Sequence, residues 1–349
     1  MKDRIVLPMV RPTAPQRVLV TGAGGFVGGW VLQGLESVQL PCLEIFAGMH
    51  RGETRAPMKN PIRIDITHPT EVDHVIKEVK PTAVIHLAAI SNVKEAREAP
   101  RAAFEVNLQG TMNLAESVLR HCPQTRFIFV SSSDVYGSSE NAQNGKLDEA
   151  APLDPQNTYA AAKAAADLSI GQMAHDGLKA IRLRTFNHTG PRQTERFVVP
   201  AFAAQIARIE IGAQEAVIRV GNLDACRDFL DVRDVADAYI GLALSSSSFE
   251  PGLVLNLGSG AGLRIGEILG QLISRAGTEI RIEADPARLR PKEPTFIIAN
   301  PSRIQHLLGW KPQIPWAQTL TDVLAFWRGA VRNSSDPQEP FKHAKGQSS

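Results

Sequence analysis

Tyr159 and Lys163 are the two side chains whose types and spacing most directly suggest chemistry. They stand four residues apart in the alanine-rich stretch NTYAAAKAAAD at 157–167, and the chain has only three tyrosines in all. Positions i and i+4 share one face of a helix, so both side chains can reach one site. A phenol has a pKa of about 10, and a nearby ammonium favours its ionised form. The pair indicates proton transfer to or from an oxygen; the alternative is an amphipathic helix with a solvated lysine.

A hydroxyl group that could hold the same oxygen occurs in FVSSSDVYG at 129–137. The preceding apolar run predicts a buried strand that ends at these serines, and ligands of parallel sheets bind at the carboxyl ends of strands. A phenol, an ammonium and a hydroxyl suit a step in which a carbonyl oxygen gains a proton during hydride transfer.

A glycine-rich turn, VTGAGGFVGGW at 20–30, links the first apolar run to the first helical pattern. Its spacing is G-x-x-G-x-x-G at Gly22, Gly25 and Gly28, which would let the backbone approach a pyrophosphate at a helix N-terminus. No lysine and hydroxyl follow as a P-loop requires, so a dinucleotide site is the favoured interpretation. The second strand ends in His50 and Arg51 rather than an acid, which favours the 2′-phosphate of NADP.

The elements that must position these residues alternate between apolar runs and helical patterns from residue 17 onward. This alternation predicts an α/β fold with a doubly wound parallel sheet, a Rossmann domain, and a smaller mixed α/β lobe. The expected parts are a lead-in at 1–16, a cofactor domain at 17–186 plus about 230–259, a second lobe at 187–229 plus about 260–331, and a flexible tail at 333–349. Helices are expected near 101–121, 158–174, 197–211 and 232–244, and LVLNLGSG is expected to add a strand to the main sheet.

Composition excludes several classes of protein. A net charge of +2 argues against nucleic acid or an anionic membrane as partner, and no apolar run is long enough to span a bilayer. Three separated cysteines predict a reduced, cytoplasmic protein. The nine histidines show no HExxH or Cys/His cluster, so no metal site is expected, and His86 is expected to be a packed strand residue. The absence of G-x-S-x-G argues against a Ser-His-Asp hydrolase.

Six motifs occur in an order that resembles the extended short-chain dehydrogenase/reductase superfamily. They are TGAGGFVG, Asp65-Ile66, HLAA at 86–89, Asn107 in NLQGT, SSSDVYG and the YxxxK pair. The resemblance implies that Tyr159 is the acid–base residue, that Lys163 holds the nicotinamide ribose and lowers the tyrosine pKa, and that Ser132 bonds the reacting oxygen. The residues it assigns to NADP, or alternatively NAD, are Gly22, Gly25, Phe26, Val27, Gly28, Arg51, Asp65, Ile66, Leu87, Ala88, Ala89, Asn107, Tyr159 and Lys163.

The second lobe resembles enzymes that handle GDP-linked 4-keto-6-deoxyhexoses. The strings are RTFNHTGPRQ, GNLDACRDFLDVRDV and DPARLRPKEP, and they look most like a 4-ketoreductase that makes GDP-D-rhamnose. The resemblance assigns the sugar nucleotide to Asp134, Asn187, Val198, Arg227 and Arg290, and arginine forks suit a diphosphate. A salt bridge at the surface, beside Asp228, is the alternative for Arg227.

Several alternatives stay open. A GDP-mannose 4,6-dehydratase carries Glu where this chain has Asp134, but it has NHESPR where this chain has NHTGPR. GPRQ also departs from the GPGQ usual in the reductases. A GDP-6-deoxy-D-talose product, another nucleotide-sugar epimerase and a non-catalytic NADP-binding scaffold are further possibilities. Look-alikes pair through the helices at 101–121 and 158–174, which implies a homodimer with a four-helix bundle.

Overall fold

The computed structural model describes residues 15–40, 42–50, 59–139, 145–288 and 296–334. Arg51 and Arg290 lie outside the described residues, as do most of the expected lead-in and tail. The chain divides into two compact units. Unit 1 comprises Met1–Phe186, Arg233–Gly258 and Ala299–Lys311, and unit 2 comprises Asn187–Val232, Ser259–Ile298 and Pro312–Ser349.

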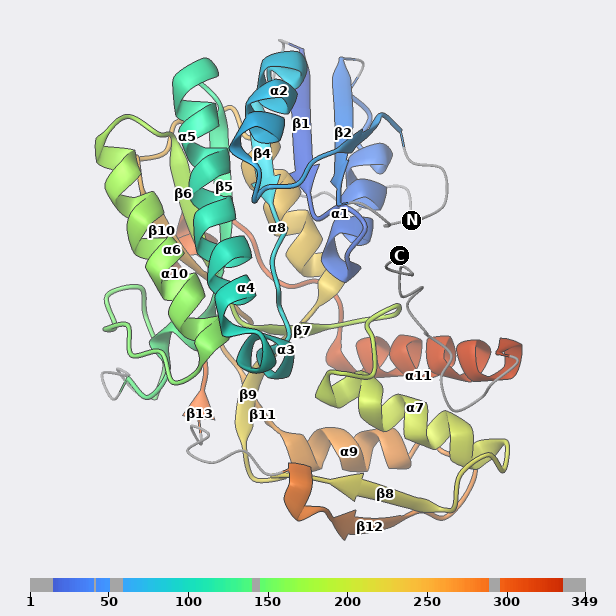
Figure 1. Ribbon diagram of the computed structural model, residues 1–349. Coiled ribbons are helices and arrows are strands. Elements are labelled where there is room, and N and C mark those ends of the chain that lie inside the picture. Colours follow the sequence, from blue (N-terminus) through green and yellow to red (C-terminus); the bar gives the residue numbers. More distant parts are fainter. Residues whose placement is uncertain (1–14, 41, 51–58, 140–144, 289–295, 335–349) are drawn as a thin grey trace. The chain divides into compact units, whose positions relative to one another are not determined.

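Unit 1 is built on a seven-stranded sheet in which all neighbouring strands are parallel. The strand order is β10-β6-β5-β4-β1-β2-β3, so the winding reverses between β1 and β4 (Figure 1). This topology confirms the doubly wound fold and the extra strand that LVLNL adds. The strands are β1 (Gln16–Thr21), β2 (Leu43–Met49), β3 (Pro61–Arg63), β4 (Ala83–His86), β5 (Arg126–Ser132), β6 (Ala180–Thr185) and β10 (Leu253–Leu257).

Helices cover both faces of this sheet, which explains why central strands such as β4 are buried along their whole length. Helices α1 (Phe26–Ser37) and α8 (Val232–Leu244) pack closely, since a Cβ on Gly34 would lie 2.4 Å from the Ile240 Cδ1. Helices α2 (Pro69–Val79), α5 (Thr111–His121) and α6 (Thr158–His175) form the other layer, and their inner faces share one apolar core with β4 and β5 (Figure 1). The shorter helices are α3 (Val93–Glu98), α4 (Pro100–Phe104), the 3₁₀ turn η2 (Ser133–Tyr136) and α10 (Ser302–Leu308).

The single helix expected at 101–121 is interrupted in the structure. Helix α4 ends at Phe104, a π-helical segment η1 (Glu105–Gly110) follows, and α5 resumes at Thr111. Short π-helical insertions occur mostly as widened turns and are frequent at functional sites. This insertion carries Asn107, one of the residues that the resemblance assigns to the cofactor.

The described residues of unit 2 form two small sheets and three principal helices. Strand β9 (Cys226–Asp231) pairs with β7 (Asn187–Thr189), β11 (Gly262–Arg264) and β13 (Phe296–Ile297), while β8 (Val217–Val220) pairs with β12 (Arg281–Ala284). Helices α7 (Val198–Glu210), α9 (Ile265–Ile273) and α11 (Trp316–Asn333) enclose an apolar core around the fully buried Trp327. Residues 299–311 pack in unit 1, although the sequence pattern assigned all of 260–331 to the second lobe. The roles of the two units as cofactor and sugar-nucleotide domains stay a prediction.

Candidate active site

The glycine turn brings two backbone segments into close contact. Gly22 has a φ of +68°, and a Cβ there would lie 2.7 Å from the amide nitrogen of Ala88. A Cβ on Gly28 would lie 2.3 Å from the carbonyl oxygen of Gly22, so neither position tolerates a side chain. Gly25 is the N-cap of α1, and Phe26 and Val27 open the helix behind it. The turn therefore exposes backbone rather than side chains at the carboxyl end of β1, as a bound pyrophosphate needs.

Asp65 lies after β3 in a network of short hydrogen bonds. Its Oδ1 accepts bonds from the hydroxyl (2.7 Å) and the amide (3.0 Å) of Thr67, and its Oδ2 lies 3.1 Å from the Nε2 of His50 and 3.3 Å from the Nδ1 of His68. Burial favours a raised pKa, but the Thr67 and His50 contacts outweigh it and lower the pKa of Asp65 to about 2. Asp65 is therefore an anion at neutral pH. The neighbouring Ile66 packs against Gly110, where a Cβ would come within 2.7 Å of it.

The segment after β4 is held by backbone and amide contacts. Leu87 donates its amide to the carbonyl of Thr21 (3.2 Å), and Ala88 donates its amide to the Thr21 hydroxyl (3.3 Å). Asn107 brackets the backbone of Ile90, with its Oδ1 accepting from the amide at 2.8 Å and its Nδ2 donating to the carbonyl at 3.0 Å. These bonds fix the path of HLAA, including Ala89, beside the glycine turn.

His86 is fully buried, and both of its ring nitrogens are engaged. Nδ1 lies 2.7 Å from the Thr21 hydroxyl, and Nε2 lies 2.9 Å from the Thr111 hydroxyl. Thr111 donates its own proton to the carbonyl of Asn107, so Nε2 must be the protonated nitrogen. Burial, with the positive charge of Lys163, lowers the pKa of His86 to about 3. His86 is thus neutral and links Thr21 of β1 to Thr111 at the start of α5, in keeping with a packed strand histidine.

Ser132, Asp134 and Tyr159 come together at the carboxyl end of β5. Helix α6 begins after Asn157, whose side chain accepts a bond from the Ala160 amide (2.9 Å), and this cap sets Tyr159 in the first turn. The Ser132 hydroxyl is close enough to the Tyr159 phenol to influence its pKa as a hydrogen-bonding group. The Ser132 Oγ also accepts a bond from the amide of Asp134 (3.2 Å). Burial and then the negative charge of Asp134 raise the pKa of Tyr159, while the Ser132 bond opposes them. The phenol is therefore protonated at neutral pH.

Lys163 lies one turn further along α6 and is almost fully buried. Its Nζ donates to the carbonyl of Val130 and lies 4.3 Å from the centre of the Phe129 ring. Burial lowers the pKa of Lys163 to about 7, although the charge of Asp167 opposes this shift. The effect expected from Lys163, a lowered tyrosine pKa, is not among the influences on Tyr159, whose pKa is raised.

The described residues assigned to the sugar nucleotide lie in unit 2, with the exception of Asp134. Asn187 opens β7 opposite Phe229 of β9, and Val198 is the first residue of α7. Arg227 is 7% exposed and donates to the carbonyl of Cys226 (2.8 Å). Asp228 beside it is fully buried and accepts bonds from Ser259 and Gly260, so both residues lie below the surface.

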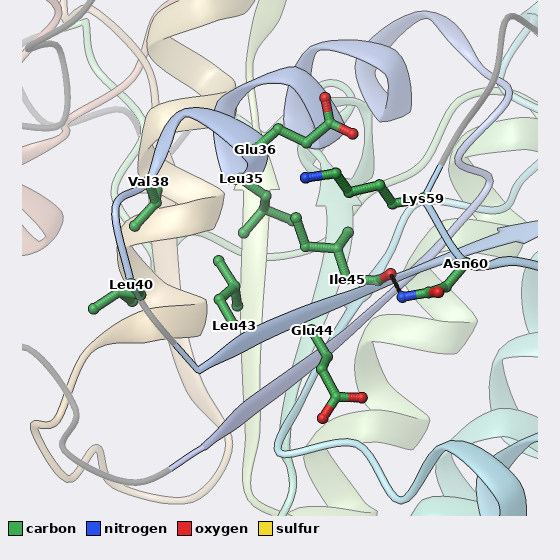
Figure 2. A pocket seen from close by; sticks show the side chains of 9 residues that line it. All are labelled: Leu35, Glu36, Val38, Leu40, Leu43, Glu44, Ile45, Lys59 and Asn60. Carbon is green, nitrogen blue, oxygen red and sulfur yellow. Dashed lines mark hydrogen bonds between the residues drawn. The ribbon is translucent and has the colours of Figure 1, made fainter.

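Two cavities are lined by residues other than those predicted for the site. One, of about 200 Å³, sits at the amino end of β2 and has an apolar lining of leucine, valine and isoleucine side chains, together with the charged side chains of Glu36, Glu44 and Lys59 (Figure 2). It is at the opposite end of the strands from the predicted site. The other, of about 510 Å³ in unit 2, is lined by residues of α7 and its surroundings that the sequence analysis did not single out: Glu195, Ala201, Gln205, Arg208, Ala213, Gln214 and Arg219. None of the described helices combines the length and the apolar character that a membrane crossing requires.

Comparisons with known proteins show relatives that match nearly the whole chain. The sequence profile of the family described as GDP-mannose 4,6 dehydratase matches residues 19–323. A GDP-6-deoxy-D-mannose reductase of Pseudomonas aeruginosa is 36% identical over 318 residues, which cover 91% of this chain and 99% of that protein. The structure of RMD from Pseudomonas aeruginosa complexed with NADPH is similar with a TM-score of 0.78 at 34% identity, covering 90% and 99% of the two chains. A Thermus thermophilus UDP-glucose 4-epimerase in complex with NAD has a TM-score of 0.77 at 28% identity, covering 90% and 100%.

Proposed function

The chain belongs to the GDP-mannose 4,6-dehydratase family of extended short-chain dehydrogenases/reductases, and we propose that it is a 4-ketoreductase. It reduces the 4-keto group of GDP-4-keto-6-deoxy-D-mannose to give GDP-D-rhamnose, with NADPH as cofactor and NADH as a possible substitute. The observation that carries the proposal is the meeting of Ser132, at the carboxyl end of β5, with Tyr159 in the first turn of α6, in a chain similar to a GDP-sugar reductase. That edge is where parallel sheets of this kind bind ligands.

The protonation states of these residues suit reduction. Bound NADPH supplies the hydride that adds to the carbonyl carbon. A protonated Tyr159 then gives its proton to the carbonyl oxygen, which Ser132 holds and polarises. Because its pKa is raised, Tyr159 carries its proton at neutral pH and has one to donate, whereas oxidation of an alcohol would need the phenolate as base.

The residues that would hold the cofactor are those around the glycine turn. Gly22 and Gly28 leave room for a pyrophosphate, and Asp65 is a permanent acceptor that suits an amine such as that of adenine. The similarity to an NADPH-bound reductase supports NADP, while NAD-bound epimerases of the same fold keep NAD open. His50, directly after β2, is the described residue of the pair His50 and Arg51 that we associate with a 2′-phosphate.

A second candidate function is GDP-mannose 4,6-dehydration. The specific observation that favours it is the position of Asp134, whose charge acts on Tyr159 and which could remove a proton from the sugar. A reduction with the opposite stereochemistry at C4, giving GDP-6-deoxy-D-talose, would use the same residues. We further propose that the protein is a cytoplasmic homodimer that pairs through the helices at 101–121 and 158–174.

The test is an assay with freshly generated GDP-4-keto-6-deoxy-D-mannose, in which NADPH or NADH oxidation is followed by absorbance and the product sugar is identified. We expect GDP-D-rhamnose from the wild type. We expect Tyr159→Phe to lose a factor of about 10²–10⁴ in kcat, because general acid catalysis contributes that much. Conversion of GDP-mannose itself to the 4-keto sugar would instead establish the dehydratase, and full activity of Tyr159→Phe would contradict the mechanism.

A further inference from the structure

A buried carboxylate lies on α6, one turn beyond Lys163. Asp167 is fully buried, and its two oxygens are held by two arginines of β6. The Nη1 of Arg182 and the Nη2 of Arg184 both lie 3.1 Å from Oδ1, and the Nε of Arg184 lies 3.2 Å from Oδ2. Tyr159, Lys163 and Asp167 follow at i, i+4 and i+8, so they share one face of the helix.

The two arginines are themselves fixed from several elements. Arg184 donates to the Tyr136 hydroxyl (3.1 Å) and to the carbonyl of Glu149 (3.1 Å), and Tyr136 in turn donates to Asn256 (2.6 Å). Arg182 donates twice to the carbonyl of Gly252, at 2.8 and 3.1 Å. Its guanidinium passes over Gly171, where a Cβ would lie 2.5 Å from Nη1. The position of the Asp167 carboxylate is therefore determined by rigid strands and not by α6 alone.

Such a cluster needs a reason beyond stability. Replacing a buried ion pair by apolar residues is often neutral or stabilising, so buried pairs are weak contributors to fold stability. What the cluster does supply is a carboxylate held in place by two guanidinium groups, and this carboxylate acts on the ammonium of Lys163, four residues away on the same face of α6. The groups that face Lys163 are the Val130 carbonyl and Phe129 ring from β5, the neutral His86 from β4, and Asp167 on its own helix.

We propose that Asp167 is a positioning residue that keeps Lys163 protonated in the active site, and that Arg182 and Arg184 hold the carboxylate in the place where it can do so. The direction of the effect follows from the opposing influences on Lys163. Burial lowers the pKa of this lysine to about 7, and the charge of Asp167 is the influence that raises it. Without that charge, the pKa falls further and the lysine is neutral at physiological pH. The inference rests on the proposed function only in taking Lys163 as a residue that serves the cofactor.

The experiment compares the wild type with Asp167→Asn, which keeps the size of the side chain and removes its charge. The readouts are the pH dependence of kcat/KM for the 4-keto sugar and, without any sugar, the pH dependence of the Kd for NADPH from its fluorescence. A charged Lys163 is present below its pKa, so both readouts should deteriorate as the pH rises through it. We call this decline at high pH the alkaline limb of each pH profile. We expect Asp167→Asn to move the alkaline limb to lower pH by about one unit or more, since an opposite charge nearby shifts a pKa by that amount.

Two further variants separate electrostatics from loss of structure. Tyr136→Phe removes hydrogen bonds from the same cluster but changes no charge, so its alkaline limb should match that of the wild type. Asp167→Glu keeps the negative charge, so it should keep most of the pH range that Asp167→Asn loses. The proposal would be overturned if, in both readouts, the alkaline limb of Asp167→Asn fell at the same pH as the limbs of the wild type and of Tyr136→Phe. A shifted NADPH-binding limb together with no turnover of the 4-keto sugar would uphold this inference and reject the proposed function.

Discussion

At the scale of single residues, the sequence suggested candidate side chains for chemistry but not the environments that set their charge. The i, i+4 spacing placed Tyr159 and Lys163 on one face, and the serine run supplied a hydroxyl at a strand end. The raised pKa of Tyr159 depends on burial and on Asp134, which η2 brings beside it. The lowered pKa of Lys163 results from the burial of its ammonium group against Phe129 and Val130 of β5. These surroundings come from strands far apart in the sequence, and no local pattern encodes them.

Asp134 distinguishes the two candidate reactions. In a reductase its negative charge makes Tyr159 a weaker acid, so Asp134→Asn lowers the tyrosine pKa and leaves a better proton donor. We expect the kcat for reduction of the 4-keto sugar at pH 7 to be equal to or above that of the wild type. In a dehydratase the carboxylate would act as general base, and its loss would lower kcat by a factor of about 10²–10⁴.

Steady-state rates with GDP-mannose and with the 4-keto sugar, measured on the same preparation of Asp134→Asn, decide between these outcomes. The matched control is Asp148→Asn, a half-buried acid whose side chain caps a turn by accepting from the amide of Ala150 (3.0 Å). A large loss of reductase activity in Asp134→Asn alone would show that the carboxylate, not only its charge on Tyr159, takes part in the reaction.

At the scale of elements, the strands and long helices were predictable because burial on both faces and helical periodicity repeat along the chain. The π-helical segment was not, because its six residues, EVNLQG, carry no distinguishing pattern. Its existence depends on tertiary contacts: the Asn107 amide bonds to Ile90, and Gly110 packs against Ile66. The departure of GPRQ from the pattern usual in the reductases is likewise explained only by the backbone conformation of these four residues.

GPRQ forms a tight turn with an arginine in a conformation that favours glycine. The Gln193 amide donates to the Gly190 carbonyl (3.3 Å), Pro191 is the first central residue, and Arg192 has a φ of +76°. This is the pattern of a type II turn, which takes glycine at the second central position. The turn is anchored by the buried Gln193 side chain, which accepts from Thr189 (2.7 Å) and donates to the His188 carbonyl (3.2 Å), so the backbone does not relax.

We therefore expect Arg192→Gly to raise the free energy of unfolding by about 1 kcal/mol, because a left-handed conformation costs an L-residue about 1–2 kcal/mol and the flexibility of glycine in the unfolded chain offsets part of this. Urea unfolding measures the change. Arg192→Ala is the control, since it removes the guanidinium and keeps the strained backbone, and it should bring no gain. A glycine variant less stable than the alanine variant would contradict this account of the turn.

At the scale of the whole molecule, the sequence was sufficient to predict a doubly wound parallel sheet. It was not sufficient to predict that residues 299–311 return to unit 1 after the preceding segment has packed in unit 2. That return is held by the indole of Trp310, which donates to the carbonyl of Asp234 (3.3 Å), and by a bridge between Leu147 and Ala299. Both contacts join positions more than 70 residues apart. A short segment whose partners are so remote leaves no signal in local composition.

The proposed homodimer has a physical correlate on the helices of unit 1. Leu168 of α6 is 62% exposed and Phe104 of α4 is 39% exposed, although large apolar side chains are more often buried. Both lie on helices that the resemblance assigns to a four-helix interface. Covering such side chains with those of a second copy removes apolar surface from water, at about 25 cal/mol per Å².

We expect Leu168→Glu to weaken the dimer at least about tenfold, because an unpaired carboxylate buried in an interface costs more than the 1.4 kcal/mol that a tenfold change represents. Light scattering across a dilution series measures the dissociation. Leu307→Glu is the control, since Leu307 is 48% exposed on α10, outside the proposed interface, and its variant should dissociate like the wild type. A wild type that is monomeric at every concentration would refute the dimer, and equal effects of the two substitutions would place the interface elsewhere. If the dimer is confirmed, the helix that carries Tyr159, Lys163 and Asp167 is braced on one side by the strands of its own sheet and on the other by a second subunit.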